Sequence, residues 1–328
     1  MRDDRVTLQI NLAPTDLPHA VHILPHQLRQ WARQVDEVLL VLDTHQSRGR
    51  FAEGWEERLP KMRDLINRCC AAYPNTHFQE VDYSPEVMAS VGSLFFAQPS
   101  VPTKDYRGGP FYSYFFGLYA AKHNYVFHMD SDLMFGGGSQ TWIAEGIQLL
   151  ANKTDVLTCS PLPGPPTSDG QLKTQTAETE PYASLAFRFS HFSSRLFLLD
   201  KQRFSTKMQR LRLNPPAFSN IVKAWIEGNP PYEIPEVLFT QAMVEHGLFR
   251  VDFLGQEPGM WSIHPPYRSE TFYQKLPELI QRIETGNIPE AQRGDYDLND
   301  CLIDWTDVRV ALQKKYWRRR LIKKLIPI

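Results

Sequence analysis

The sequence predicts an α/β fold in which helices flank a mostly parallel central sheet. Short apolar runs, typical of buried strands, alternate along the chain with longer segments of helical periodicity. Strands that alternate with helices form βαβ units, and the strands of such units run parallel. A chain of 328 residues, 42% of them hydrophobic, can bury one large core. We therefore expect a Rossmann-like domain over residues 1–270 and a helical, basic C-terminal extension over residues 271–328.

The first part of the chain supplies the predicted βα units. Three apolar runs predict strands, the last of them weaker, at residues 6–13, 37–43 and 76–83. Helical spacing begins at Pro25, because proline suits a first helical position, and a second helix is predicted over residues 55–73.

An aromatic stripe then predicts a helix that feeds the next strand. Apolar residues from Phe111 to Tyr119 recur at helical spacing after Pro110, and we interpret them as core packing. The strand that follows ends in "HMDSD". Later elements are predicted as helices at 141–151 and 235–248, a strand at 155–160, and loops at 161–181 and 261–272.

Composition excludes several classes of protein. The formal net charge of −1 gives no reason to expect a nucleic-acid partner. The four cysteines lack zinc or CxxC spacing and indicate reduced thiols. The N-terminus lacks the features of a signal peptide, and no apolar run reaches the ~20 residues that cross a bilayer. We expect a cytoplasmic protein.

Two carboxylates stand at the end of the strand in "YVFHMDSD". Alternate residues of a strand point to the same side, so Asp130 and Asp132 are expected to project together. Open α/β sheets bind ligands at the carboxyl ends of their strands. Two like charges there repel unless a cation lies near them, and Mg²⁺ or Mn²⁺ prefers oxygen ligands. The alternative is a solvated strand end with two incidental acids; the apolar strand and the preceding βα units favour a metal site.

An ordered series of motifs resembles a known family. "PTD" after the first strand, Asp43 after the second, "RGGP" before a helix and "HMDSD" after a strand are similar to the GT-A glycosyltransferases, most closely the family 2 type. The resemblance covers residues 6–135 in order and extends more loosely to about 270. It implies a nucleoside-diphosphate sugar donor, here a UDP-sugar, and Mn²⁺ or Mg²⁺ held by the DxD motif against the diphosphate. It also implies transfer to an acceptor hydroxyl, on a glycan or a lipid-linked intermediate.

The resemblance also implies which residues bind the donor and the metal. The donor-binding residues are Pro14, Thr15 and Asp16 beside the nucleoside, Asp43 at the base or ribose, Arg107 near the diphosphate, and Asp130. The metal ligands are Asp130, Asp132 and, from "WSIHPP", His264. An arginine and a helix N-terminus both favour anionic oxygens, which agrees with the place of Arg107. Asp43 could instead cap its turn, and Arg107 could be an ordinary surface residue.

Glu236 and Asp132 are the expected catalytic residues. Glu236, in "YEIPEVLF", resembles the acid that acts as the general base in inverting members. The usual Glu-Asp pair is absent because Val237 follows, so Glu233 and Asp252 remain competitors. A glutamate in the first turn of a helix is also favourable without any chemistry.

Two other functions remain open. A nucleotidyltransferase that acts on sugar phosphates also pairs carboxylates on a metal, but it needs a glycine-rich, lysine-containing loop that "LAPTDLPHA" does not provide. A non-catalytic nucleotide-sugar-binding protein would not need both carboxylates. A haloacid-dehalogenase phosphatase fits poorly, because its DxD follows the first strand of the domain.

The C-terminal residues 308–328 predict a membrane role. They contain eight Lys or Arg residues and no acid, and Trp317, Leu321 and Leu325 recur every four residues. Basic residues beside an apolar strip favour an anionic membrane surface. The expected location is therefore cytoplasmic and peripheral at the inner membrane. The alternative is that the strip packs on the catalytic domain.

Overall fold

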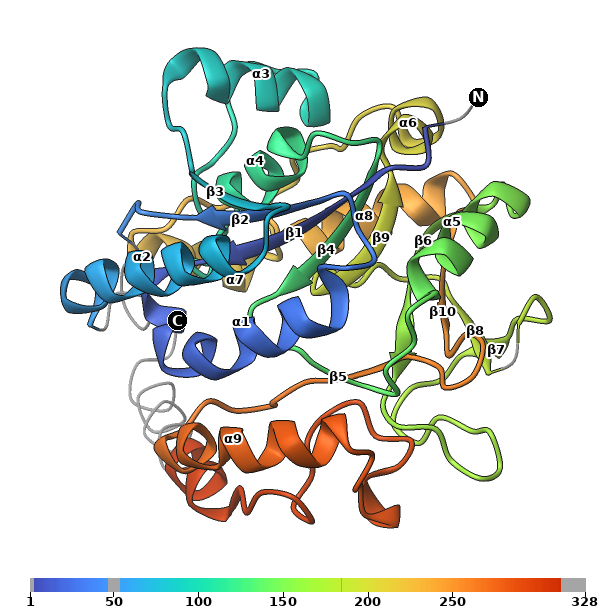
Figure 1. Cartoon of the computed structure of the whole chain (residues 1–328). Coiled ribbons are helices and arrows are strands. Elements are labelled where there is room, and N and C mark those ends of the chain that lie inside the picture. Colours follow the sequence, from blue (N-terminus) through green and yellow to red (C-terminus); the bar gives the residue numbers. More distant parts are fainter. Residues whose placement is uncertain (1–2, 47–53, 184, 314–328) are drawn as a thin grey trace.

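A central mixed sheet with helices on both faces forms the body of the protein (Figure 1). The computed structural model describes residues 3–46, 54–183 and 185–313. Its strands are β1 (Val6–Leu12), β2 (Glu37–Leu42), β3 (Thr76–Glu80), β4 (Tyr125–Asp130), β5 (Met134–Gly136), β6 (Val156–Pro163), β7 (Glu178–Thr179), β8 (Ala186–Phe189), β9 (Leu196–Asp200), β10 (Phe249–Phe253) and β11 (Trp261–Ile263). The strand order is β3-β2-β1-β4-β9-β6-β10-β8-β7, and β11 pairs with both β5 and β6. This arrangement confirms the predicted α/β class.

The helices vary from a single turn to eighteen residues. They are α1 (Leu17–Trp31), α2 (Trp55–Ala72), α3 (Pro85–Phe96), α4 (Tyr112–Ala120), α5 (Trp142–Asn152), α6 (Lys201–Arg203), α7 (Phe218–Glu227), α8 (Pro235–Glu245) and α9 (Glu270–Glu284). Short 3₁₀ turns cover Pro14–Asp16 and Glu290–Gln292, and a π-helical turn covers Phe204–Met208.

Two separate cores lie on the two faces of the sheet. Alternate residues of β1, β2 and β4 pack with α1, α2 and α5 on one face. The other residues of β2, with those of β9, pack with α3, α4 and α8 on the other face. A third cluster joins α9 to β11 and to Trp305, and Figure 1 shows α9 as an extra layer beyond α1. The sheet is therefore buried on both faces, as parallel sheets require.

The register of the strands brings several strand ends to one edge. β1 is parallel to β2 and β4, with Leu12 opposite Leu42 and Asn11 opposite Asp130. The loops after these three strands therefore lie side by side. β9 runs antiparallel between β4 and β6, so the residue before it, Arg195, reaches the same edge and accepts a hydrogen bond from the Asp130 backbone N–H at 2.8 Å.

Three predicted boundaries are wrong. α1 begins at Leu17, with Pro18 in its first turn, so Pro25 lies inside the helix. α4 begins at Tyr112, because Pro110 instead lies in a β-bridge with Lys104. Strand β6 continues to Pro163, so the long loop predicted from residue 161 starts later.

The described residues from α9 to Trp305 pack closely on the rest of the structure. His26 of α1 is buried, and its Nδ1 donates a hydrogen bond of 2.7 Å to Glu284 of α9. Trp305 is 1% exposed and donates its indole N–H to the Leu298 carbonyl. The division at residue 270 stays a prediction. Among the described residues no helix is long and apolar enough to cross a membrane, and most of the basic segment at 308–328 lies outside them.

Candidate functional site

The turn after β4 is held by side chains of α1. Gln27 is fully buried and donates hydrogen bonds from Nε2 to the carbonyls of Asp130 and Leu133, at 2.8 and 3.0 Å. His19 Nε2 lies 3.1 Å from Ser131 Oγ, and burial lowers the pKa of His19 to about 4. The turn that carries both aspartates is thus fixed from one helix.

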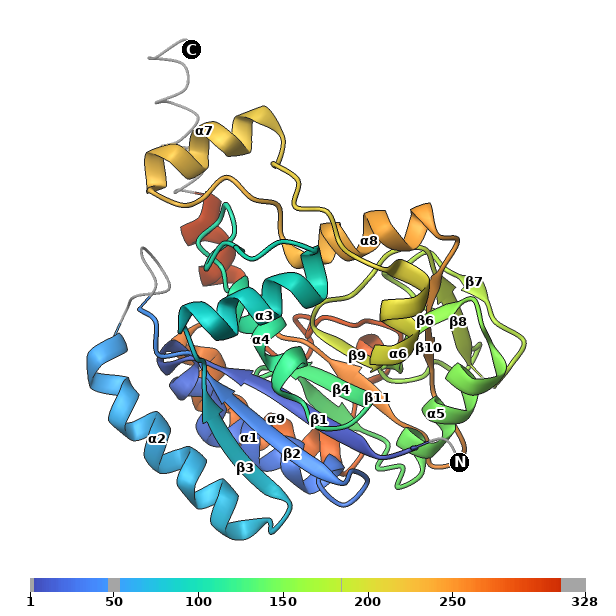
Figure 2. The ribbon, with the colours of Figure 1, turned by 90° about the horizontal axis from the view of Figure 1, so that it is seen from above.

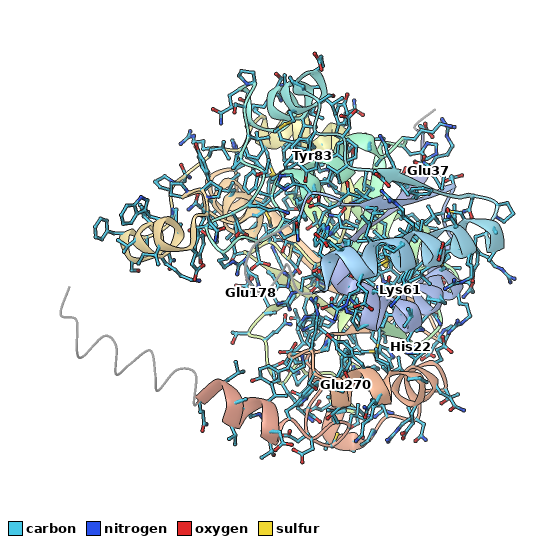
Figure 3. All side chains as sticks on the ribbon, turned by 90° about the vertical axis from the view of Figure 1, so that its left-hand side faces the viewer. His22, Glu37, Lys61, Tyr83, Glu178 and Glu270 are labelled. Atoms are coloured by element: carbon cyan, nitrogen blue, oxygen red, sulfur yellow. The ribbon has the colours of Figure 1, made fainter. Side chains whose placement is uncertain are left out.

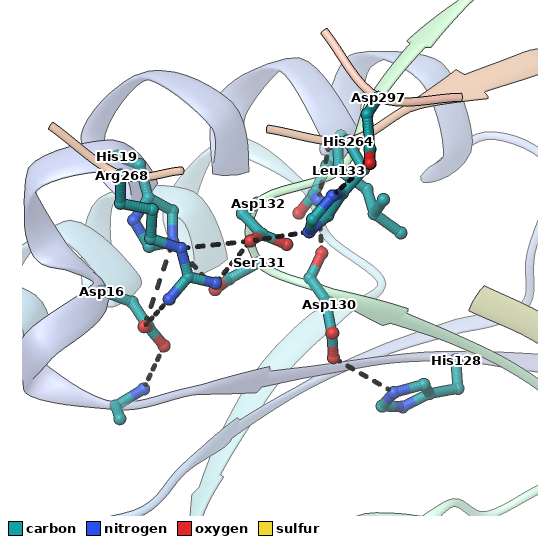
Figure 4. Close-up of polar contacts among 12 residues, drawn as sticks. Asp16, His19, His128, Asp130, Ser131, Asp132, Leu133, His264, Arg268 and Asp297 are labelled. Carbon is teal, nitrogen blue, oxygen red and sulfur yellow. Dashed lines mark hydrogen bonds and ion pairs between the residues drawn. The ribbon is translucent and has the colours of Figure 1, made fainter. Parts of the chain in front are cut away.

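The two aspartates have different surroundings (Figure 4). Asp130 is the last residue of β4, its side chain is 40% exposed, and its Oδ1 lies 3.7 Å from His128 Nε2. Asp132 lies in the following turn and is 1% exposed. The expectation that strand alternation makes them project together is wrong, because the strand ends at the first of the two.

Arg268 supplies the positive charge beside Asp132. Its Nε and Nη2 both donate hydrogen bonds to Asp132 Oδ2, the first at 3.1 Å, and its Nη1 lies 4.0 Å from Asp16 Oδ1. Burial alone would raise the pKa of Asp132, but Arg268, His264 and His19 outweigh it and hold that pKa well below its usual range. Figure 4 shows Arg268 between Asp16 and Asp132.

His264 lies on the other side of Asp132. Its Nδ1 lies 2.9 Å from Asp297 Oδ1 and its Nε2 lies 3.7 Å from Asp132 Oδ2. Because carboxylate oxygens accept hydrogen bonds, Nδ1 is the donor to Asp297, and Nε2 is the ring nitrogen that faces Asp132. A histidine fixed by a carboxylate in this way is typical of metal ligands.

A divalent cation fits this donor set, although no complete metal cage is preformed. Asp132 Oδ1 is buried and has no hydrogen-bond partner within the described residues, and Asp130 presents an exposed carboxylate. Oxygen ligands with one imidazole suit Mn²⁺. Nowhere in residues 3–46, 54–183 or 185–313 do three His, Cys, Asp or Glu side chains form a ready-made metal cluster.

The loop after β1 also lies beside Arg268. Pro14–Asp16 forms a 3₁₀ turn in which Asp16 Oδ2 accepts the Ala13 N–H at 2.9 Å. This bond turns the other carboxylate oxygen of Asp16 toward Arg268. Pro14 is buried and Thr15 is partly exposed.

Asp43 is engaged by the protein itself. Its Oδ1 accepts hydrogen bonds from the His45 backbone and the Tyr83 hydroxyl, each at 2.9 Å, and Lys104 Nζ lies 3.2 Å from Oδ2. The bond to His45 is the turn cap that the sequence left open as an alternative.

Arg107 lies in a loop organised by Asp105. Asp105 Oδ1 accepts the backbone N–H groups of Arg107 and Gly109, at 2.7 and 2.9 Å, and a Cβ at Gly109 would come within 2.7 Å of this carboxylate. The Arg107 side chain is 44% exposed, and its Nη2 lies 3.7 Å from Asp105. Within the described chain it makes no hydrogen bond or ion pair with Asp130 or Asp132.

A polar cavity of about 240 Å³ is lined by Arg195 and Tyr296, among other residues. Glu236, in the first turn of α8, lines it and accepts hydrogen bonds on Oε2 from the Ser194 backbone at 3.3 Å and hydroxyl at 3.1 Å. Asp252 also lines it, 3.0 Å from Arg250, and burial raises the pKa of Asp252 to about 6 against the effect of that arginine. Glu233 is not one of the lining residues.

Arg195 lies between the cavity and the aspartates. Burial would lower its pKa, but Tyr296, Asp130 and Asp132 together raise it. Its guanidinium has no hydrogen bond or ion pair within the residues that the structure describes. Sequence reasoning missed both Arg195 and Arg268; the only signal for the latter was a basic residue four positions after His264.

Comparisons with known proteins give only distant similarity. No known family model matches the chain, and no curated protein sequence does. Similar solved structures include TarS from S. aureus in complex with UDP-GlcNAc, at 11% identity and TM-score 0.40, covering 88% of this chain and 68% of that one. The mannosyltransferase PcManGT from Pyrobaculum calidifontis, in complex with GDP-Man and Mn²⁺, has 12% identity and TM-score 0.36, with 77% and 57% covered.

A third similar structure is the galactosyltransferase LgtC in complex with donor and acceptor sugar analogs. It has 10% identity and TM-score 0.31, and the match covers 87% of this chain and 98% of that one. At these scores the similarities carry no argument about activity. The function has to be argued from the geometry of the site.

Proposed function

We propose that the chain is a glycosyltransferase that moves a sugar from a nucleoside-diphosphate sugar, a UDP-sugar in the first instance, to an acceptor hydroxyl. The observation that carries this proposal is the meeting of Asp130, Asp132, His264 and two arginines at the carboxyl end of β4. Carboxylates bind a metal cation and arginines bind phosphate oxygens, so this combination of side chains suits a ligand that carries both a cation and phosphate groups.

Different residues would bind the metal, the diphosphate and the nucleoside of the donor. Asp130, Asp132 and His264 would hold Mn²⁺ or Mg²⁺, which supplies Lewis-acid stabilisation of the diphosphate oxygens when bound. Arg268 and Arg195 add fixed positive charge where the leaving group becomes more negative. Asp16 lies beside Arg268, and Pro14, Thr15 and Asp16 would border the nucleoside. Asp43, after β2, and Arg107 would bind other parts of the donor.

The transfer step needs a proton acceptor near the cavity. The bond between the anomeric carbon and the diphosphate oxygen breaks, and the acceptor oxygen bonds to that carbon. The acceptor hydroxyl loses its proton to a base, which we assign to Glu236 because it lines the cavity with a carboxylate fixed by Ser194. The bonding electrons leave with the nucleoside diphosphate, so the reaction balances without another reagent.

A donor panel tests this proposal. UDP-, GDP- and CDP-sugars with Mn²⁺ should include one that raises the melting temperature, because a ligand of the folded state stabilises it by mass action. Asp130→Asn should abolish that shift and lower transfer at least about 100-fold. Asp64→Asn, an exposed aspartate on α2, is the matched control. EDTA should have the same effect as Asp130→Asn.

Other outcomes would favour the alternatives. Release of pyrophosphate from a nucleoside triphosphate and a sugar phosphate would indicate a nucleotidyltransferase. Donor binding without transfer or hydrolysis would indicate a binding protein. A glycan or lipid-linked acceptor and a peripheral location at the cytoplasmic face of a membrane belong to the same proposal.

A further inference from the structure

The helix α7 turns an apolar face to solvent. Phe218, Trp225 and Ile226 are 80%, 83% and 70% exposed, and Ala224 is the one buried residue of this helix. Monomeric proteins seldom leave large apolar side chains together in water, because burying each would contribute about 1.5–3 kcal/mol. Figure 2 shows α7 beyond α3, outside the layers that cover the sheet. Its exposed face therefore indicates a binding surface.

The pattern of residues along α7 is that of an amphipathic helix facing outward. At about 100° per residue, the apolar side chains fall on one face. They are Phe218, Ile221, Val222, Trp225 and Ile226. The polar residues Ser219, Asn220, Lys223 and Glu227 take the other directions. A helix that covers a core would have the apolar face inward, so the orientation of α7 needs a partner outside the described chain.

The position of α7 is nevertheless fixed. Asn229, just after the helix, donates a backbone hydrogen bond of 2.8 Å to Ala224 and a side-chain bond of 3.4 Å to the Tyr106 carbonyl. Lys223 Nζ lies 5.9 Å from the centre of the Tyr106 ring. Tyr106 precedes Arg107, so these contacts attach α7 to a loop of the candidate site.

The end of the described chain lies on the same side of the molecule as α7. Figures 2 and 3 both show the helical residues 306–313 and α7 projecting from the same side of the sheet, and Figure 3 labels Glu270 at the start of the C-terminal part. The basic sequence 314–328 follows directly and contains seven Lys or Arg residues and no acid. The apolar face of α7 and residue 313, after which the basic sequence begins, therefore lie on one side of the molecule.

We propose that α7 docks the protein on an anionic membrane surface. Trp and Phe favour the boundary between headgroups and acyl chains, and each basic residue near an anionic leaflet contributes about 1 kcal/mol. A second copy of the chain fits less well. Three exposed side chains supply roughly 400–600 Å², whereas a stable interface buries about 800 Å² per partner.

This docking places the membrane beside the loop that carries Arg107. The inference rests on the proposed function in one respect: it assigns the acceptor hydroxyl to a lipid of the same surface. An acceptor held in the bilayer would reach the site from the α7 side. The docking itself depends only on α7 and on the basic sequence that follows residue 313.

Flotation with vesicles tests the docking. Full-length protein should bind vesicles of phosphatidylglycerol and phosphatidylcholine but not pure phosphatidylcholine. The triple variant F218S/W225S/I226S should bind the anionic vesicles at least tenfold more weakly. The matched controls are Val244→Ser, a 64% exposed apolar residue on α8, and Phe78→Ser on the edge strand β3. Both controls should bind as the wild type does.

Two measurements separate the possible failures. If the triple variant floats like the wild type, or if the wild type does not bind anionic vesicles, the docking role of α7 is wrong. If sedimentation shows a wild-type dimer that the triple variant loses, the partner is a second copy. A cooperative thermal unfolding transition without ligand, measured on the same proteins, shows that each variant is folded, and the shift caused by the donor reports donor binding separately. If the wild type floats with anionic vesicles but binds none of the donors, the proposed function is wrong and the docking role of α7 stands.

Discussion

Arg268 donates two hydrogen bonds to Asp132, so a residue of the chain itself supplies the positive charge beside this buried acid. A divalent ion and the guanidinium would compete for the same carboxylate. Charge-assisted bonds of this kind contribute about 1.5–3 kcal/mol each. Binding of a metal before the donor therefore has to overcome this pairing.

Replacing Arg268 should favour the metal. In Arg268→Gln we expect Mn²⁺ to bind about tenfold more tightly without nucleotide, equivalent to about 1.4 kcal/mol. The donor diphosphate should bind more weakly, since it loses a cation. Mn²⁺ titration followed by electron paramagnetic resonance measures the first effect. Arg107→Gln, which leaves Asp132 untouched, should keep wild-type Mn²⁺ affinity, and unchanged affinity in Arg268→Gln would contradict the competition.

Glu236 should act in the transfer step and not in donor binding. Glu236→Gln should lower kcat at least about 100-fold, because the acceptor proton loses its base, while the donor Kd stays the same. Glu233→Gln is the control, since Glu233 Oε1 caps the neighbouring Ile234 N–H and lies outside the cavity. If Asp252→Asn instead removes activity and the acidic limb of the pH profile near 6, the base is Asp252.

The contact between α1 and α9 should make stability depend on pH. The hydrogen bond from His26 and the Arg29 pair lower the pKa of Glu284 to about 2, below its unfolded value of 4.5. The folded state therefore binds the proton less readily than the unfolded state, so this stabilisation is complete above pH 4.5 and is lost as the pH falls toward 2.

Urea unfolding at pH 7 and pH 3 measures this effect. Glu284→Gln should lower the free energy of unfolding by about 1 kcal/mol at pH 7, because the site is partly solvated, and by less at pH 3. Glu278→Gln, on the exposed face of the same helix and 3.9 Å from Arg282, should change little at either pH. An equal loss in both variants would show that the His26 contact contributes nothing specific.

The sequence predicts the part of the fold that depends on local pattern. The runs that became β2 and β4 are apolar over several residues, so burial on both faces is visible in the letters alone. β1 alternates apolar and polar residues, and its letters do not show that Thr7 and Gln9 are buried as well. The direction of β9 cannot be predicted from local pattern, because its antiparallel place between β4 and β6 depends on pairing with distant strands. β5 and β11 have three residues each, too few for a periodic signal.

The same limit applies to the site. Asp130 and Asp132 stand out in the sequence because two acids follow an apolar strand, and His264 is expected beside them from the family resemblance. The structure places His264 Nε2 3.7 Å from Asp132 Oδ2, while the metal role of the three residues stays a prediction. Arg268 pairs with a residue 136 positions away, which depends on how the segment before α9 packs. Gln27 looks like any polar helix residue, although it holds the turn.

The bond between His264 and Asp297 has a consequence for synthesis of the chain. The N-terminal part of a polypeptide leaves the ribosome first, and segments of the chain fold as they emerge. The strands from β1 to β4 are complete long before residue 297 appears, yet the partner of His264 comes from that later stretch. A nascent chain would therefore carry the strands β1 to β4 while the candidate site still lacked the residue that orients His264.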